Sequence, residues 1–132
     1  MKNFNEMKQM EYGATWKEEL LLAGKYNGFN YIIMSYGKHP CCYIEIPRKN
    51  KLYKKHYGEI NSLGIEVHGD FTYSDFENFG FGFRKKYYIG WDYAHHGVDF
   101  SGLYLPCTVG KKWTTEELLE EIKLVIDQIA KI

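Results

Sequence analysis

The residues of this chain that are best suited to chemistry are histidines and aspartates in two short segments. The first segment contains His68 and Asp70, and the second contains Asp92, His95 and Asp99. Each begins at the end of a predicted strand and continues into a loop, and residues at strand ends and in the loops beyond them often bind ligands. We therefore expect the two strand ends to lie side by side and to open onto one shared hollow.

Three interpretations of these residues remain open. Imidazole and carboxylate groups together can bind zinc, manganese or iron, and His68, Asp92 and His95 would be the ligands of such a metal. A histidine oriented by an aspartate can instead transfer protons near neutral pH. The third interpretation is structural, because His and Asp side chains satisfy backbone groups in tight glycine turns such as those at Gly69 and Gly97.

Cationic side chains are interleaved with aromatic rings in two further segments, residues 48–57 and 84–91. Lysine and arginine attract phosphate, and aromatic rings offer surfaces on which a base can stack, so this mixture predicts a nucleotide or a phosphorylated small molecule. The residues expected to contact phosphate are Arg48, Lys51, Lys54, Arg84 and Lys86. A base would stack on Tyr57, Tyr87 or Trp91, with His68, Asp92 and His95 lining the pocket. The alternative is that the rings belong to the core and the cations are solvated.

The composition of the chain argues against several classes of protein. The 17 basic and 17 acidic residues give no net charge, which argues against a partner such as long nucleic acid. The 3 cysteines include the adjacent Cys41 and Cys42 and show no Cys-x-x-Cys spacing, so neither a disulfide framework nor a zinc ribbon is indicated. No segment resembles a signal peptide or a membrane helix. We expect a cytoplasmic protein in which residues 1–132 form a single domain.

Two capping-box patterns predict helices. Thr15 to Glu18 would begin a short helix that ends at Gly24, and Thr114 to Glu117 would begin a longer one. The longer helix is amphipathic, with an apolar stripe formed by Leu118, Leu119, Ile122, Val125, Ile126 and Ile129.

Alternating apolar residues predict strands over residues 28–36, 41–46, 65–68 and 86–92, with extended segments at 71–73 and 103–109. The first two strands would form a hairpin, and residues 48–57 and 74–86 would be loops. The predicted fold is α+β, an antiparallel sheet of about 4–6 strands with the C-terminal helix and the short N-terminal helix packed on it.

The segments 67–74 and 89–99 resemble a family of mostly uncharacterised proteins of phages and prophages. Its members carry Val-His-Gly-Gly-x-Thr-x-Ser and then Trp-x-Gly-Phe-Asp-x-Ala-His-x-Gly-Asp. The segment from Gly37 to Pro40 is also similar to a Gly-His-Pro segment of that family, so the resemblance covers about residues 26–100. The chain differs from the pattern at Asp70, where glycine is usual, and at Val98, which is inserted before Asp99.

The resemblance implies a class of function. Small phage proteins often inhibit host defence, and some act as sponges that bind cyclic nucleotide or cyclic ADP-ribose signals without cleaving them. By analogy we expect a non-enzymatic, homo-oligomeric protein without a cofactor that sequesters a nucleotide-derived signal. One alternative is a small metal-dependent hydrolase acting on a nucleotide or phosphorylated substrate through His68, Asp92 and His95. Another is a protein-binding inhibitor that presents the acidic face of its last helix as a nucleic-acid mimic.

Overall fold

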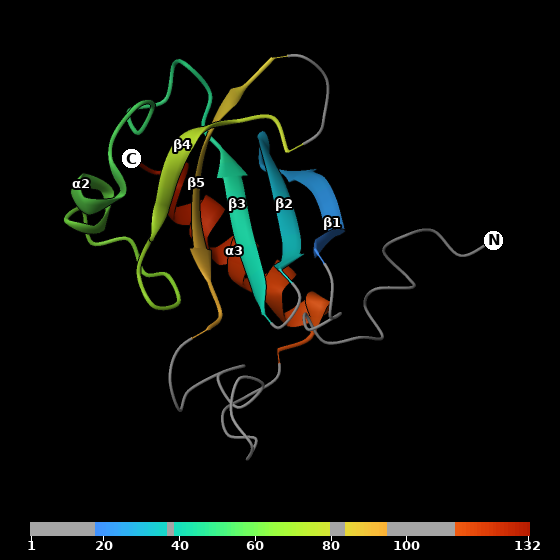
Figure 1. Ribbon diagram of the computed structural model, residues 1–132. Coiled ribbons are helices and arrows are strands. Elements are labelled where there is room, and N and C mark those ends of the chain that lie inside the picture. The colour runs from blue at the N-terminus through green and yellow to red at the C-terminus, as the bar shows by residue number, and fades with distance from the viewer. Residues whose placement is uncertain (1–17, 37–38, 80–83, 95–112) are drawn as a thin grey trace.

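The computed structural model describes residues 18–36, 39–79, 84–94 and 113–132. They form a five-stranded antiparallel sheet with a helix packed on one face, as Figure 1 shows. The strands neighbour one another in the order β1 (Glu18–Tyr26), β2 (Phe29–Tyr36), β3 (Pro40–Glu45), β5 (Lys86–Asp92) and β4 (Tyr73–Glu77). Helix α3 (Thr115–Ile129) lies against the sheet, and the short helix α2 (Tyr57–Asn61) lies beside β4. The predicted α+β class is confirmed.

Helix α3 forms as its sequence predicts. Thr114 Oγ1 accepts a hydrogen bond from the Glu117 backbone N–H at 3.2 Å, and the Glu117 carboxylate accepts one from the Thr114 N–H at 3.0 Å, which completes the capping box. The apolar stripe then faces the sheet, where Leu118, Ile122, Val125, Ile126 and Ile129 are fully buried. The strand residues that they join in the core include Leu22, Ile33, Cys42, Ile44, Ile89 and Trp91.

The short N-terminal helix predicted to end at Gly24 is wrong, because residues 18–26 form strand β1. A shift in the register with β2 between Leu20 and Leu22 marks a bulge, so Leu21 and Leu22 are both buried although they are adjacent. A run of consecutive leucines that does not alternate is read as helix, and the bulge is what allows a strand to accommodate it. Residues 15–17 lie outside the described residues.

The strand predicted over residues 65–68 is also wrong, because this segment has no strand partner within the described part of the chain. Side chains of α3 satisfy its backbone instead. The Gln128 amide accepts from the Glu66 N–H at 2.7 Å and donates to the Glu66 carbonyl at 2.8 Å, and Glu121 accepts from the His68 N–H at 2.9 Å. The alternation correctly indicated that Ile65 and Val67 face the core, but they pack on it from a loop and not from a strand.

Of the remaining predicted elements, some are confirmed and others differ from the structure. The hairpin of β2 and β3 and the strand β5 are confirmed. Strand β4 occupies residues 73–77, most of which were assigned to a loop, and α2 begins within the segment 48–57 that was predicted as a loop. The extended segment predicted over 103–109 lies outside the described residues. No helix in the described ranges is long and apolar enough to cross a membrane.

The outer face of the sheet, opposite α3, carries a second apolar cluster. Its buried members are Ile32, Cys41, Tyr43 and Tyr88, and its half-buried members are Leu20, Met34, Tyr73 and Phe79. Both faces of the central strands are therefore largely covered by side chains.

Replacing Leu118 by Asp should lower the free energy of unfolding by at least about 3 kcal/mol, because a carboxylate would enter a site that is 0% exposed. Urea denaturation followed by circular dichroism measures this change. Leu124 on the same helix is 62% exposed, so Leu124→Asp is the matched control and should change the free energy by no more than about 0.5 kcal/mol. Equal stabilities of the two variants would contradict the packing of α3 described here.

Candidate functional site

A hollow of about 290 Å³ lies at the end of the sheet where β3 ends and β5 begins. We call it the basic hollow. It is lined by the cations Arg48, Arg84, Lys85 and Lys86, the rings of Tyr53, Phe76 and Tyr87, and the residues Glu45, Ile46 and Pro47. The two cationic segments singled out in the sequence therefore meet in space.

The pairing of β3 with β5 brings these cations together. Glu45 lies opposite Tyr88 in the register, and the Ile46 N–H donates to the Tyr87 carbonyl at 2.8 Å. Because the strands are antiparallel, the residues that follow Ile46 and those that precede Tyr87 emerge at the same end of the sheet. Arg48 lies three residues after the end of β3, and Arg84 and Lys85 directly precede β5, so all three cations border one hollow.

Three aromatic rings form one side of the basic hollow. The Tyr53 ring lies edge-on to Tyr87 at 5.7 Å and to Phe76 at 6.0 Å between ring centroids, and the Phe76 and Tyr87 centroids are 5.0 Å apart. Tyr87 is 6% exposed, whereas Tyr53 and Phe76 are half-buried. Tyr53 and Phe76 therefore offer the more accessible aromatic surface.

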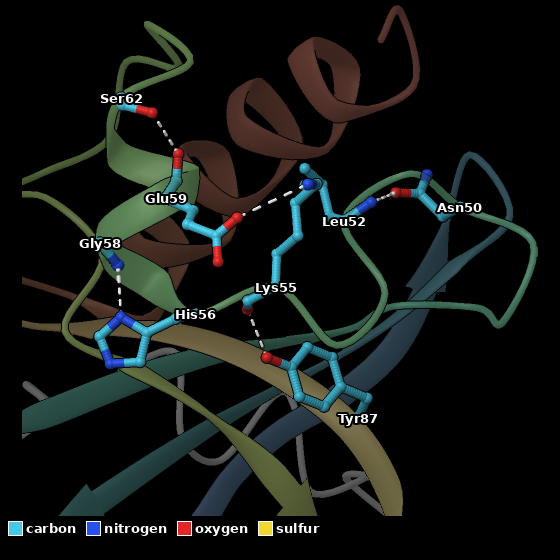
Figure 2. A network of polar contacts seen from close by, with 8 residues as sticks. All are labelled: Asn50, Leu52, Lys55, His56, Gly58, Glu59, Ser62 and Tyr87. Atoms are coloured by element: carbon cyan, nitrogen blue, oxygen red, sulfur yellow. Dashed lines mark hydrogen bonds and ion pairs between the residues drawn. The ribbon is translucent and has the colours of Figure 1, made fainter.

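The segment 48–57 that carries Arg48 and Tyr53 forms successive hydrogen-bonded turns, and Figure 2 shows some of the contacts that hold it. Leu52 is fully buried, and its N–H donates to the Asn50 side chain at 2.9 Å. The Tyr87 hydroxyl donates to the Lys55 carbonyl, which ties the turn to β5. This fastening fixes the turn next to β5, where Arg84 and Lys85 enter the hollow.

The same network continues into α2. His56 is the N-cap of this helix, and its Nδ1 accepts a hydrogen bond from the Gly58 N–H at 3.0 Å (Figure 2). The Lys55 ammonium lies 3.7 Å from the Glu59 carboxylate, one helical turn away. His56 and Lys55 therefore help to hold the turn in place and do not line the hollow.

Other predicted contacts lie outside the lining of the basic hollow. Lys51 and Lys54 are exposed on the turn, and the Lys54 ammonium lies 5.8 Å from the centroid of the Tyr53 ring. Tyr57 begins α2, and its N–H donates to the Ser74 hydroxyl at 3.0 Å. Trp91 is only 1% exposed and donates from Nε1 to the Tyr93 hydroxyl at 3.2 Å, so its ring belongs to the core and is not available to a base.

The expected meeting of two strand ends is found only in part. The His68 ring stacks on Tyr93, which follows Asp92, with 4.4 Å between centroids and an interplanar angle of 11°. Asp92 ends β5, however, whereas the basic hollow lies where β5 begins, and the length of the strand separates them. The sequence analysis predicted one pocket shared by His68, Asp92 and the cations. That prediction is wrong, because neither His68 nor Asp92 lines the basic hollow. His95 lies outside the described residues.

Around Asp92 the described contacts are those of a turn. Its carboxylate accepts a hydrogen bond from the Ala94 N–H at 3.2 Å. Among residues 18–36, 39–79, 84–94 and 113–132, no group of three or more His, Cys, Asp and Glu side chains is arranged to hold a metal ion. These contacts agree with the structural interpretation of Asp92.

The sequence analysis missed some residues that line the basic hollow. Tyr53 and Lys85 lay within the interleaved segments but were not selected. Phe76 was assigned to a loop, and only its place on β4, where it packs against Tyr87, brings it to the hollow. The interleaving of rings and cations was a sufficient signal for Tyr53 and Lys85, whereas no local signal marked Phe76.

No protein-family model, curated protein or solved structure matches this chain. The resemblance to phage and prophage proteins therefore stays a prediction from two sequence segments.

The adjacent cysteines should be unreactive in the folded protein. Burial, reinforced by the charge of Asp92, raises the pKa of Cys41 from 9.0 to about 12, and burial raises the pKa of Cys42 well above 9.0. In a Cys107→Ser background, iodoacetamide at pH 8 should leave both thiols unmodified by mass spectrometry until guanidinium is added, because thiolate is the nucleophile. Rapid modification of the native protein would contradict this burial.

The same shift predicts a loss of stability at alkaline pH. The folded-state pKa of Cys41 lies above its ordinary value of 9.0, so the folded state holds the thiol proton more tightly than the unfolded state does. The corresponding contribution to stability is present below pH 9.0 and is lost as the pH rises towards about 12. Urea denaturation at a series of pH values measures it, and Cys41→Ala, which lacks the titrating group, is the control.

Proposed function

We propose that this chain binds a nucleotide-derived, phosphate-bearing small molecule in the basic hollow and sequesters it. The observation that carries the proposal is the meeting of Arg48, Arg84, Lys85 and Lys86 with a half-buried aromatic ring, Tyr53, around one hollow. Guanidinium groups can hold a phosphate through two parallel hydrogen bonds, and lysines add positive charge. A base stacked on an aromatic side chain contributes roughly 1–3 kcal/mol.

The size of the hollow favours a small ligand. Its volume of about 290 Å³ is just below the range of roughly 300–1,000 Å³ that is typical of small-molecule sites. The zero net charge of the chain gives no general attraction to a long polyanion, so the attraction is local to this end of the sheet.

The lining also supports binding as the main activity of this site. Its cationic and aromatic groups provide phosphate contacts and a stacking surface, and both of these act on the bound ligand without changing it. The sequence resemblance to phage and prophage proteins supports the narrower proposal that the ligand is a signal of host defence.

Isothermal titration calorimetry with AMP, cyclic mononucleotides, cyclic dinucleotides and ADP-ribose derivatives tests the proposal. At least one ligand should bind, and Arg84→Gln should weaken its binding about tenfold or more, because a charge-assisted hydrogen bond is worth about 1.5–3 kcal/mol. Lys131→Gln is the matched control, since Lys131 is an exposed cation after α3 and does not line the basic hollow.

Two results would count against the proposal. Either no ligand of the panel binds, or Arg84→Gln and Arg48→Gln both bind as the unmodified protein does. Mass analysis of the ligand recovered after incubation separates sequestration from turnover. An unchanged mass agrees with sequestration, whereas a cleaved ligand would favour the hydrolase alternative.

A further inference from the structure

A second hollow, of opposite character, lies on the outer face of the sheet. We call it the tyrosine hollow. It has a volume of about 340 Å³, and its lining includes the rings of Tyr36, Tyr43, Tyr73 and Phe79 and the carboxylates of Glu18 and Glu77. None of these residues lines the basic hollow, so the two hollows can be tested independently.

A glycine in the middle of β5 allows the rings of this hollow to meet. Tyr43 on β3 and Tyr73 on β4 both lie opposite Gly90, one on each side of it. A Cβ at Gly90 would stand 2.5 Å from Cδ1 of Tyr43, so any side chain there would displace the ring. With glycine, the Tyr43 and Tyr73 rings meet edge to face at 5.1 Å above the intervening strand.

Phe79 forms another wall of the tyrosine hollow. Its φ of 50° lies in the left-handed region, which an aromatic residue rarely adopts. The Glu77 carboxylate accepts hydrogen bonds from the N–H groups of Asn78 and Phe79 at 2.9 and 3.3 Å, and these bonds support the turn. The Phe79 ring is thereby held 4.6 Å from Tyr43 between centroids.

Tyr36 completes the aromatic lining at the end of β2. The Tyr43 hydroxyl donates to the Tyr36 hydroxyl at 3.0 Å, which links the two rings across neighbouring strands. Tyr43 is 6% exposed and Tyr36 is 36% exposed, so the aromatic lining extends from the buried sheet surface to solvent.

The charged side chains among the described residues that line this hollow are acidic. Among the described residues that line it there is no lysine, arginine or histidine, whereas Glu18 and Glu77 are both present. Burial raises the pKa of Tyr36, and the charges of Glu18 and Glu77 raise it further. Burial and the charges of Glu77 and Asp75 likewise raise the pKa of Tyr73 to about 12. Burial disfavours a charge of either sign, whereas the carboxylates of Glu18 and Glu77 oppose a phenolate and favour a cation.

We propose that the tyrosine hollow binds an alkylated ammonium group. Ring faces attract a cation through their quadrupoles, and a quaternary ammonium loses little hydration when it enters an aromatic site. The carboxylates of Glu18 and Glu77 supply the opposite charge. The volume of the hollow suits a small organic cation, because it lies within the lower part of the range for small-molecule sites, roughly 300–1,000 Å³.

The test compares choline with 3,3-dimethylbutan-1-ol, which has the same shape but a neutral carbon in place of nitrogen. The probe is the set of tyrosine ring resonances of the full chain in NMR titrations. Choline should shift these resonances in a saturable way, and the neutral analogue should not do so at the same concentrations. Equal binding of the two compounds, or binding of neither, would overturn the proposal.

Two variants locate the site. Tyr36→Leu removes a partly exposed ring and Glu18→Gln removes a carboxylate without a change of shape, and each should weaken choline binding by about twofold to fivefold. Glu59→Gln is the control, because Glu59 is an exposed carboxylate on α2 outside the hollow. If Tyr36→Leu lowers the melting temperature substantially, the choline affinity of Glu18→Gln alone is used to test the proposal. Choline binding that is unchanged in Glu18→Gln would overturn the proposal.

Discussion

The packing of α3 against the inner face of the sheet is the interaction on which the rest of the structure depends. Each fully buried Leu, Ile or Val on that helix contributes about 1.5–3 kcal/mol of hydrophobic stabilisation, and strands from across the sheet share the resulting core. The helix also holds residues 66–68 through Gln128 and Glu121. Because α3 covers one face, the other face and the sheet ends are left for the two hollows.

The sequence predicted the elements whose local pattern matches their tertiary setting. Helix α3, the hairpin of β2 and β3, and strand β5 each have the expected period and turn signals. Strand β1 was missed because its bulge breaks the alternation. Asn27 and Gly28, with φ of 48° and 84°, do form the Asn-Gly turn that is typical of a tight hairpin. That dipeptide was the available evidence that a strand precedes β2.

The candidate site could be predicted only as two lists of cations and rings. The two groups meet in one hollow because of the register in which β3 pairs with β5. Sequence periodicity does not specify this register, because the two strands are far apart in the chain. The tyrosine hollow was not predicted at all. Rings on strands are usually core residues, and only the position of Gly90 between Tyr43 and Tyr73 brings their side chains together above the outer face.

The strand order also combines local and long-range pairings. Strands β1, β2 and β3 follow one another closely in the chain and can pair through local contacts, whereas β3 and β5 are separated by residues 46–85. Closing that long segment costs chain entropy before any pairing is gained, so we expect β5 to dock more slowly than β1, β2 and β3 pair with one another. The residues that line each hollow come from both sides of the β3–β5 junction, from the strands and from the turns next to them. Both hollows are therefore complete only when β5 lies between β3 and β4.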